Sequence, residues 1–391
     1  MLIMKTMNMT DRGLSRFVYW MAVWTALVGL GAWAAEAPRG GTGLHGAPAE
    51  RAWQGPKDGP STELFRSGTS WNGRRIASYR IPAICRAKNG TLIAACDQRC
   101  DKGGDLNCYQ PIRIVYRRSH DNGVTWTEPR RMHELAWNDQ VQQSASDPSL
   151  LVDRETGAVF CFWNSWEWVK DKGHYRHFVQ RSDDAGATWG APREITADIT
   201  RPEWQGKPHL FISSGHADQL RDGTLVHTLV WVNKHQMGLF GSCDHGQTWK
   251  PLGTLVGPAD ECKLVELADG TWMVNTRLAR GGGRGVHLSR DRGATWETRI
   301  DSKLIDPVCN AALLKLSDGR LAFSNCASSR ARCAVGVRTS SDAGQSWSAP
   351  VVVEPGPSAY SDIVELPGGR IGILYEQGPY RSIRFATLSK F

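Results

Sequence analysis

The sequence predicts an all-β fold made of repeated four-stranded sheets, and three observations support this prediction. An octamer of the pattern S-x-D-x-G-x-[TS]-W occurs five times, with starts 63, 60, 47 and 51 residues apart. Between the octamers, apolar and polar residues alternate and are interrupted by Asp-Gly, Thr-Gly or Gly-Gly turns. The 391 residues include 41 Gly and 17 Trp, which suits many tight turns and a recurring hairpin motif. One octamer and one hairpin in each repeat predict a β-propeller.

The octamers indicate how many sheets the fold contains. They are Ser119–Trp126, Ser182–Trp189, Ser242–Trp249, Ser289–Trp296 and Ser340–Trp347. In each octamer the Asp carboxylate can accept hydrogen bonds from backbone N–H groups of its own turn, and the Gly permits a positive φ. The Trp can pack back over the hairpin. We therefore interpret these Asp residues as turn formers rather than catalysts, and five octamers plus one sheet without an octamer predict six blades.

The segments between the octamers and at the two ends supply the remaining strands. "IPAIC" and "NGTLIAAC" form one predicted hairpin, with its turn at Asn89-Gly90. Further hairpins are predicted at residues 150–164, 219–231, 264–277, 313–325 and 363–376. "STELF" near the start and "IRFATLS" at the end are expected to complete one blade together and so close the ring. The predicted propeller domain covers residues 61–391.

The first 60 residues differ from this pattern. Three basic residues precede an apolar run, Phe17–Ala35, that ends in an A-x-A arrangement of small residues. This layout predicts a signal peptide over residues 1–35 and an exported protein, with a retained membrane anchor as the alternative. Residues 36–60 are rich in Gly, Pro and Ala, which predicts a flexible leader. The formal net charge of +8 is scattered, which argues against a nucleic-acid partner and suits an anionic substrate.

The ten cysteines are interpreted through the predicted export. Cys100 and Cys108 flank one loop and Cys326 and Cys333 flank another, so two local disulfides are a hypothesis for an oxidising compartment. Buried, reduced thiols are the alternative, and they suit the cysteines that lie inside strand-like runs, which are Cys85, Cys96 and Cys161. None of the ten has the CxxC spacing of a zinc site, so we predict no metal.

The segment "YRIP" (Tyr79–Pro82) lies upstream of the repeated octamers, which are known as Asp boxes. This combination resembles the exo-α-sialidase (neuraminidase) family over roughly residues 61–391. The resemblance implies a sialidase-type six-bladed β-propeller with five Asp boxes. It also implies a retaining glycoside hydrolase that removes terminal sialic acid from glycoproteins, glycolipids or mucin through a covalent sialyl-tyrosine. No cofactor is implied, and we expect a monomer that contacts a membrane only if the N-terminal segment is retained.

Three arginines follow from the resemblance. Sialic acid has a carboxylate on its anomeric carbon, and planar guanidinium groups that stay charged bind a carboxylate in a bidentate manner. Arg80 matches the first family arginine, although alone it reads as a solvated charge at a strand end. Arg277, at the end of "DECKLVELADGTWMVNTR", matches the second. Arg332, six residues before Arg338, matches the third, with Arg330 as the alternative.

The resemblance also implies a nucleophile and its base. An anionic nucleophile beside the substrate carboxylate would face like-charge repulsion, whereas a tyrosine is neutral until it attacks. Tyr360 in "SAYSDIVEL" matches the family nucleophile. Because the pKa of a free tyrosine is about 10, it needs a base. Glu261, sixteen residues before Arg277, stands at the family's base position, and Glu266 is expected to be a solvent-facing strand residue.

The general acid is expected on the loop between the first hairpin and the first octamer. Asp105 in "GGDLN" is our choice and Asp101 is the alternative. Three further residues are implied by weaker matches. Glu376 in "ILYEQG" resembles the glutamate that orients the first arginine, and Asp147 and Asn310 occupy segments that line the sugar pocket in relatives.

Other classes of function stay open at this point. A non-hydrolytic sialic-acid-binding propeller would use the arginines but would not need Tyr360, Glu261 and Asp105 together. An exo-glycosidase for another acidic sugar, or an intramolecular trans-sialidase, would share these residues and differ in pocket side chains. A purely structural Asp-box propeller would lack the arginine set.

Overall fold

The computed structural model describes residues 61–169, 175–204 and 210–389. The predicted signal peptide (1–35) and leader (36–60) lie outside the described residues. In the described residues the regular secondary structure is almost entirely strand, and the exceptions are one short α-helix, α1 (Thr196–Ile199), and two 3₁₀ turns, η1 (Pro202–Trp204) and η2 (Val232–Lys234). In the part of the chain that is described, no helix is long and apolar enough to cross a membrane.

Backbone hydrogen bonds join the strands into successive sheets, which are mainly antiparallel. The first sheet runs β2 (Ser70–Trp71), β3 (Arg74–Arg86), β4 (Leu92–Cys100), β5 (Ile112–Ser119), β6 (Arg130–Arg131). The second runs β10 (Arg193–Glu194), β9 (Arg176–Ser182), β8 (Val159–Glu167), β7 (Gln143–Val152), β12 (Gly215–His216), and β12 is parallel to β7. The third runs β11 (Leu210–Ile212), β14 (Leu225–Trp231), β15 (Gln236–Ser242), β16 (Lys250–Val256), with β13 (Asp218–Gln219) also paired to β14.

The C-terminal strands form two further sheets. The first of them runs β17 (Cys262–Glu266), β18 (Trp272–Arg277), β19 (Arg284–Ser289), β20 (Glu297–Asp301). The second has seven strands, in the order β1 (Thr62–Arg66), β26 (Ser382–Leu388), β25 (Arg370–Gln377), β24 (Val351–Leu366), β23 (Cys333–Ser340), β22 (Leu321–Cys326), β21 (Ala312–Lys315). The long strand β24 pairs with β23 near its start and with β25 along the rest of its length, so it joins two four-stranded halves.

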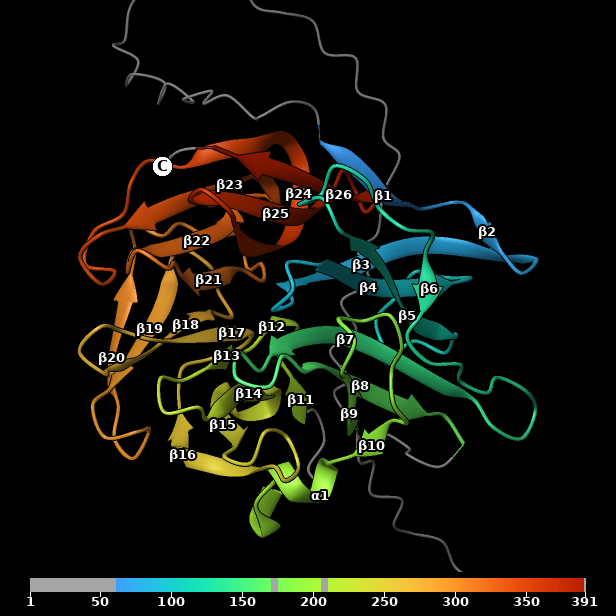
Figure 1. The fold of residues 1–391 in the computed structure, drawn as a ribbon, viewed down its shortest axis with the longest axis horizontal. Helices are drawn as coiled ribbons and strands as arrows, with labels where there is room; N and C mark the ends of the chain where they lie inside the picture. Colours follow the sequence, from blue (N-terminus) through green and yellow to red (C-terminus); the bar gives the residue numbers. More distant parts are fainter. Residues whose placement is uncertain (1–60, 170–174, 205–209, 390–391) are drawn as a thin grey trace, which may run out of the picture. The chain divides into compact units, whose positions relative to one another are not determined.

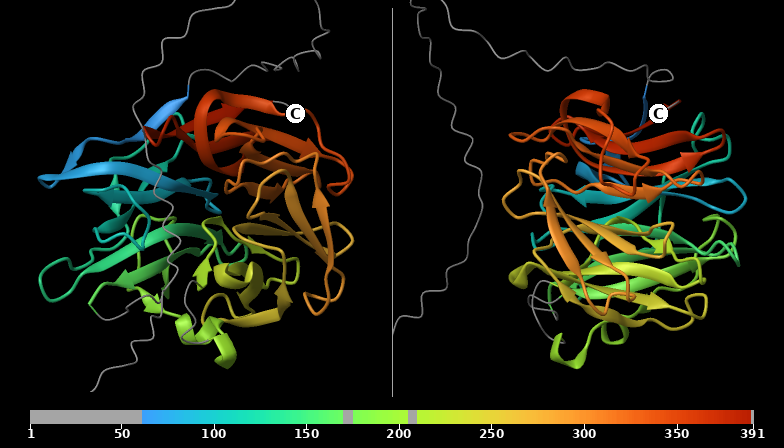
Figure 2. Two further views of the ribbon diagram at one scale, coloured as in Figure 1. Left: turned by 180° about the vertical axis from the view of Figure 1, so that it is seen from behind. Right: turned by 90° about the vertical axis from the view of Figure 1, so that its left-hand side faces the viewer.

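The sheets succeed one another around a common centre, from β3–β5 through β7–β10, β14–β16 and β17–β20 to β21–β26 (Figure 1). Figure 2 shows the same succession from behind. β1 pairs with β26, as predicted, so the first and last described strands lie in one sheet. The inner strand β3 contacts both β7 and β24, and β17 contacts β14 and β21.

Apolar side chains fill the spaces between neighbouring sheets. Within the described residues, six hydrophobic clusters each lie between two successive sheets or between the two halves of the seven-stranded sheet. The alternation along each strand explains this arrangement, because successive side chains point to opposite faces of a sheet and both faces here meet a neighbour. The apolar core is therefore divided into layers that lie between the sheets. The polar side chains at the common centre come from the inner ends of the strands.

Each octamer folds into the same turn, shown here by the first. The Oγ of Ser119 donates to Asp121 Oδ1 (2.8 Å) and accepts from the N–H of Gly123 (2.8 Å). The N–H and Oγ of Thr125 both donate to the Asp121 carboxylate, and these bonds lower the pKa of Asp121 to about 2. Gly123 has a φ of 93°, and a Cβ added to it would lie 2.1 Å from the ring of Phe385. The glycine is thus required by both backbone conformation and space.

Candidate active site

Irregular pairing in three inner strands places side chains at the centre. The register shifts within Arg80–Ala83 of β3, Ser146–Ser149 of β7 and Ser358–Ser361 of β24. Ile81 and Asp147 each precede a proline and have φ values of 59° and 61°, a conformation that is strained for a side chain such as isoleucine. A bulge bends a strand and changes the direction of its side chains. The "RIP" segment therefore forms a bulge that follows Arg80.

Tyr360, Glu261 and Arg277 form one hydrogen-bonded group, as the sequence predicts for a nucleophile, its base and an arginine. The Tyr360 hydroxyl donates to Glu261 Oε2 at 2.8 Å. Nη1 of Arg277 donates to the same Oε2 at 2.6 Å and to the Tyr360 oxygen at 3.0 Å. Glu261 immediately precedes β17 and Arg277 ends β18, and a backbone bond from Arg277 N to Glu261 O (2.9 Å) fixes them side by side. A phenol, a carboxylate and a guanidinium thus meet at one point.

The environment of Tyr360 keeps its hydroxyl protonated. Burial and, after it, the negative charge of Glu261 raise the pKa of Tyr360 well above 10, while Arg277 and Arg332 act in the opposite direction. A neutral phenol bonded to a carboxylate is the ground state expected of a nucleophile that loses its proton only as it attacks. Glu261 Oε2 is the atom that receives the hydrogen bond of this hydroxyl.

Glu376 connects Arg80 to the backbone of Tyr360. Its Oε1 accepts from Arg80 Nε (2.7 Å) and from the N–H of Ile81 (2.8 Å), and its Oε2 accepts from the N–H of Tyr360 (3.1 Å). Both side chains are almost completely buried. Burial lowers the pKa of Arg80, but the charge of Glu376 opposes this effect and the net shift is upward. Arg80 therefore stays a cation. Glu376 is therefore bonded both to Arg80 and to the backbone at Tyr360.

Arg332, rather than the alternative Arg330, lies with this group. Its Cζ lies 5.3 Å from the centroid of the Tyr360 ring, and its Nη2 donates to the carbonyl of Val308 at 2.8 Å. Arg330 is exposed. The Cζ of Arg80 also lies 5.3 Å from the centroid of the Tyr360 ring. The structure thus brings three arginines from three sheets or half-sheets around one phenol.

Asp105 and Asp101 have different partners. Asp105 accepts from Arg99 Nη1 at 2.5 Å, and its side chain is 72% exposed. The partial enclosure of Asp105 raises its pKa, but the guanidinium groups of Arg99 and Arg80 lower it more, so the net shift is downward. Asp101 is exposed and its nearest cation is Arg74, at 3.8 Å. The geometry therefore favours Asp105 over Asp101 as the acid nearest the arginines.

Two acidic side chains, Asp97 and Asp105, pair with Arg99, a residue that sequence reasoning missed. Besides Asp105, Arg99 donates to the buried Asp97 (2.9 Å), and Asp97 accepts from the N–H of Asp147 (3.0 Å). Burial and then the neighbouring charge of Asp97 raise the pKa of Asp147 to about 8. Asp97 lies opposite Arg80 in the pairing of β3 with β4, so this cluster adjoins the arginine site. The sequence signal for Arg99 is weak, because it depends on which face of β4 points to the centre.

Asn310 lies in a separate buried network. Its Nδ2 donates to Ser214 Oγ (2.9 Å), and its Oδ1 accepts from Lys263 Nζ (3.5 Å). Burial lowers the pKa of Lys263 despite the nearby charge of Asp362. The role predicted for Asn310 in sugar binding stays a prediction.

A buried imidazole next to this network gives a prediction about pH. His216 Nδ1 lies 2.5 Å from Asp362 Oδ1 and Nε2 lies 3.0 Å from the carbonyl oxygen of Leu313, so both ring nitrogens face acceptors. Burial lowers the pKa of His216, but the charge and hydrogen bond of Asp362 raise it more, and the net shift is upward. A histidine whose pKa is raised by folding stabilises the folded state fully at pH values below its pKa in the unfolded chain, which is about 6.5. This stabilisation is lost as pH rises through its pKa in the folded protein.

We therefore expect His216→Gln to lower the melting temperature most at pH 6 and below. The gap between wild type and variant should shrink by at least about 2 °C as pH is raised to 9. Thermal unfolding of both proteins across this pH range measures the gap. Parallel curves would contradict an ion pair between His216 and Asp362.

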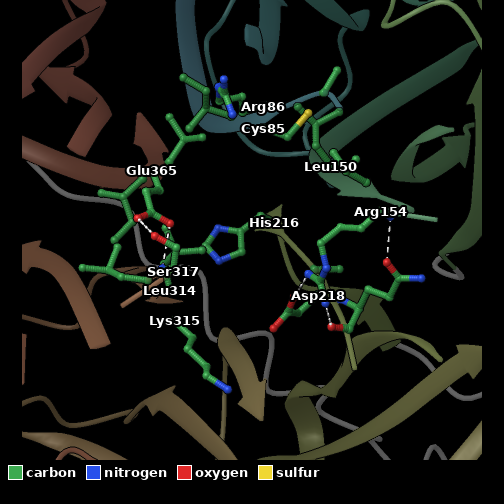
Figure 3. A pocket seen from close by; sticks show the side chains of 18 of the residues that line it. Cys85, Arg86, Leu150, Arg154, His216, Asp218, Leu314, Lys315, Ser317 and Glu365 are labelled. Carbon is green, nitrogen blue, oxygen red and sulfur yellow. Dashed lines mark hydrogen bonds and ion pairs between the residues drawn. The ribbon is translucent and has the colours of Figure 1, made fainter. Parts of the chain in front are cut away.

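A cavity of about 570 Å³ lies apart from the Tyr360 group. Figure 3 shows His216 within it, with Ser317 and Glu365 on one side and Arg154 and Asp218 on the other. None of the nine predicted site residues lines this cavity. Its walls come from the later parts of β3 and β24, beyond Arg80 and Tyr360, so it opens at the other end of the inner strands. Two ion pairs lie in its walls, Arg154 with Asp218 and Arg221 with Glu266, and Glu365 accepts hydrogen bonds from Ser317.

The hypothesis of two local disulfides is wrong for this structure. All ten cysteines lie in the described residues and all are free thiols. Cys100 is buried within β4 whereas Cys108 is exposed, so the two point to different surroundings. The Sγ of Cys326 lies 3.9 Å from that of Cys309, not beside Cys333. The predicted burial of Cys85, Cys96 and Cys161 is confirmed, and burial is the main cause that raises the pKa of each thiol.

These contacts define a class of site, in which a ring of sheets holds three guanidinium groups around a phenol and its carboxylate partner. The model of the BNR repeat-like domain matches residues 136–373 of the chain. A sialidase of Micromonospora viridifaciens is 36% identical over 350 residues, which cover 81% of this chain and 52% of the relative. A sialidase of Bacteroides fragilis (strain YCH46) is 30% identical over 334 residues, which cover 77% of this chain and 60% of the relative.

A solved structure agrees with these relatives. The Hadza microbial sialidase Hz136 is similar with a TM-score of 0.71 and 29% sequence identity, over 81% of this chain and 67% of that one. The chain belongs to the sialidase family with BNR repeats. It spans between half and two thirds of the length of the two curated relatives named above.

Proposed function

We propose that this chain is a retaining exo-α-sialidase that hydrolyses terminal sialic acid from glycoconjugates. The observation that supports this most directly is the group formed by Tyr360, Glu261 and Arg277, with Arg80 and Arg332 beside the phenol ring. Guanidinium groups suit the sialic acid carboxylate, and a neutral phenol avoids repulsion with it. A binding module would not need a carboxylate positioned to accept the proton of a buried tyrosine.

The proposed fold is a six-bladed propeller over residues 61–391, with five Asp boxes. The seven-stranded sheet supplies two blades through its shared strand β24, and the four other sheets supply one each. Six hydrophobic clusters between neighbouring sheets support the same number, because a closed ring has as many interfaces as blades. The blade without an Asp box is then the one that β1 completes with β24–β26.

In the first step, Glu261 takes the proton of Tyr360 as the phenol oxygen attacks the anomeric carbon. The bond from that carbon to the leaving oxygen breaks, and Asp105 supplies a proton to this oxygen. The product of this step is a sialyl-tyrosine. In the second step Asp105 takes a proton from water, the water oxygen bonds to the anomeric carbon, and Tyr360 leaves and regains its proton from Glu261. Two displacements return the sugar to its original configuration.

Asp105 begins this cycle in the wrong protonation state unless the substrate changes its surroundings. In the unliganded site Arg99 lowers its pKa. A bound sugar would remove water from the exposed carboxylate and bring a second carboxylate nearby, and both effects raise a carboxylic acid's pKa. We propose that substrate binding in this way converts Asp105 into a proton donor.

The experiment that tests the function uses α2,3-, α2,6- and α2,8-linked sialosides with NMR detection of the first-formed sugar. A retaining hydrolase releases the α-anomer of sialic acid first. An intramolecular trans-sialidase would release an anhydro sugar, and a binding module would release nothing. Release of the β-anomer first would contradict the proposed covalent intermediate.

Substitution of the proposed acid should depend on the leaving group. We expect Asp105→Asn to lower kcat/KM on sialyllactose by about 10²-fold or more, because an alkoxide leaves poorly without a proton. On a 4-methylumbelliferyl sialoside the loss should be at least about 10-fold smaller, because a phenol-type leaving group needs less protonation. Asp101→Asn is the matched control and should stay within about 2-fold of wild type on both substrates. Equal losses of Asp105→Asn on both substrates would contradict its role as the acid.

A further inference from the structure

Tyr380 lies at the meeting point of two of the three arginines. The Cζ of Arg80 is 3.8 Å from the centroid of the Tyr380 ring, which is closer than its distance to the Tyr360 ring. The hydroxyl of Tyr380 accepts a hydrogen bond from Arg332 Nη1 at 3.3 Å. One side chain therefore touches both Arg80, from β3, and Arg332, from the segment before β23.

The backbone of Tyr380 is in the left-handed region, which is strained for a tyrosine. Tyr380 lies in the turn between β25 and β26 and has a φ of 59°, a region that tyrosine rarely adopts. Its carbonyl accepts from Ser67 Oγ (2.7 Å), and its N–H donates to the carbonyl of Gly378 (2.8 Å). Glycine would adopt this conformation without strain. Strain of this kind persists where the side chain has a use.

The contact with Tyr380 leaves the donors of Arg80 available. Its Nε donates to Glu376, and its planar face rests on the Tyr380 ring. In the described part of the chain, the two Nη groups then remain for a ligand. A guanidinium stacked on an aromatic ring keeps its edge donors free and loses rotational freedom, which favours bidentate binding of a carboxylate.

We propose that Tyr380 is a positioning residue that aligns Arg80 and Arg332 for the carboxylate of the substrate. This inference rests on the proposed function and deepens it. Tyr380 does not take part in bond making; it determines how strongly the site distinguishes a charged from an uncharged carboxyl group. Because the arginines hold the carboxylate in both the bound substrate and the transition state, loss of this alignment should act mainly on KM.

Three variants separate the contributions of Tyr380. Tyr380→Phe keeps the ring under Arg80 and removes the bond from Arg332. Tyr380→Leu removes both contacts. Tyr380→Gly removes both and also relieves the backbone strain, so it can lose function without losing stability. Asn72→Gly is the matched control, because Asn72 also has a positive φ (49°) and lies in the turn between β2 and β3.

The readout is the preference for a free carboxylate over its methyl ester, measured as the kcat/KM ratio on 4-methylumbelliferyl sialoside and its methyl ester. We expect Tyr380→Leu and Tyr380→Gly to reduce this ratio by about 10-fold and Tyr380→Phe by about 3-fold, with kcat on the acid nearly unchanged. Asn72→Gly should leave the ratio at the wild-type value. Melting temperatures are measured in parallel, and Tyr380→Gly should not fall below wild type.

An unchanged ratio in Tyr380→Gly would overturn the inference, even if overall activity fell. An inactive wild type would instead contradict the proposed function. In that case the affinities of wild type and Tyr380→Gly for N-acetylneuraminate and its methyl ester, measured by calorimetry, decide the question. A loss of acid-over-ester preference in the variant supports the alignment by Tyr380, and equal preferences overturn it.

Discussion

Replacement of Tyr360 by phenylalanine is expected to lower kcat on a 4-methylumbelliferyl sialoside by at least two to three orders of magnitude, roughly the loss of a main catalytic group. The variant lacks the oxygen that donates to Glu261 and accepts from Arg277, but it keeps the ring beside Arg80 and Arg332. Steady-state kinetics at saturating substrate measures the loss. Binding of the substrate should be nearly preserved, because the three arginines remain.

The control for this prediction is the ability of Tyr360→Phe to bind. Its affinity for N-acetylneuraminate should stay within about 10-fold of wild type by calorimetry, and its melting temperature should be similar. Near-normal turnover in Tyr360→Phe would refute the nucleophile assignment. Mass spectrometry of wild type mixed with a 3-fluorinated sialosyl fluoride provides a direct check, since the covalent adduct should map to the peptide that contains Tyr360.

Replacement of Glu261 by glutamine should also reduce kcat by about 10²- to 10⁴-fold, because an amide cannot take the proton of Tyr360. The substitution preserves the size of the side chain and its position before β17. Arg277 loses its ion pair with Glu261 (2.6 Å) and keeps its contact with the Tyr360 hydroxyl, so the geometry of the phenol should change little.

Glu266→Gln is the matched control for Glu261→Gln, on the strand that begins one residue after Glu261. Glu266 pairs with Arg221 at 3.2 Å and lines the cavity that contains His216, away from Tyr360. Its substitution should leave kcat within about 2-fold of wild type. Equal effects of the two substitutions would show that charge in this region matters generally, and would contradict a specific proton acceptor.

The predicted site residues that lie together in the structure share a property, which is that a local motif surrounds each of them. Arg80 follows Tyr79 and precedes Ile-Pro, and Glu261 and Arg277 lie on one hairpin with a fixed spacing. The structure brings these residues together with Tyr360, which lies 99 residues after Glu261 and 83 residues after Arg277. The octamers predicted their own turns for the same reason, since the hydrogen bonds that their Ser, Asp and Thr side chains and their Gly and Thr N–H groups make within each turn are local.

The residues that the sequence missed are identified by how the folded chain places their side chains rather than by a local motif. Arg99 became visible only when β4 placed it beside Asp97 and Asp105, and Tyr380 only when two sheets brought Arg80 and Arg332 to it. The cysteine hypothesis failed because it used separation along the chain. The closest pair of sulfur atoms, Cys309 and Cys326, belongs to different strands and loops, and spacing carries no information about which face a thiol occupies.

The pairing of β1 with β26 has a consequence for the order in which the protein folds during its synthesis. The strand that starts at Thr62 pairs with Ser382–Phe385, so it stays without this partner until that much later segment has been synthesised. The same delay applies to Arg80, whose carboxylate partner, Glu376, lies 296 residues later. A nascent chain therefore forms neither contact until the segment that contains Glu376 and Ser382–Phe385 has been synthesised, so the closure of this sheet and the orientation of Arg80 belong to the same late stage of folding.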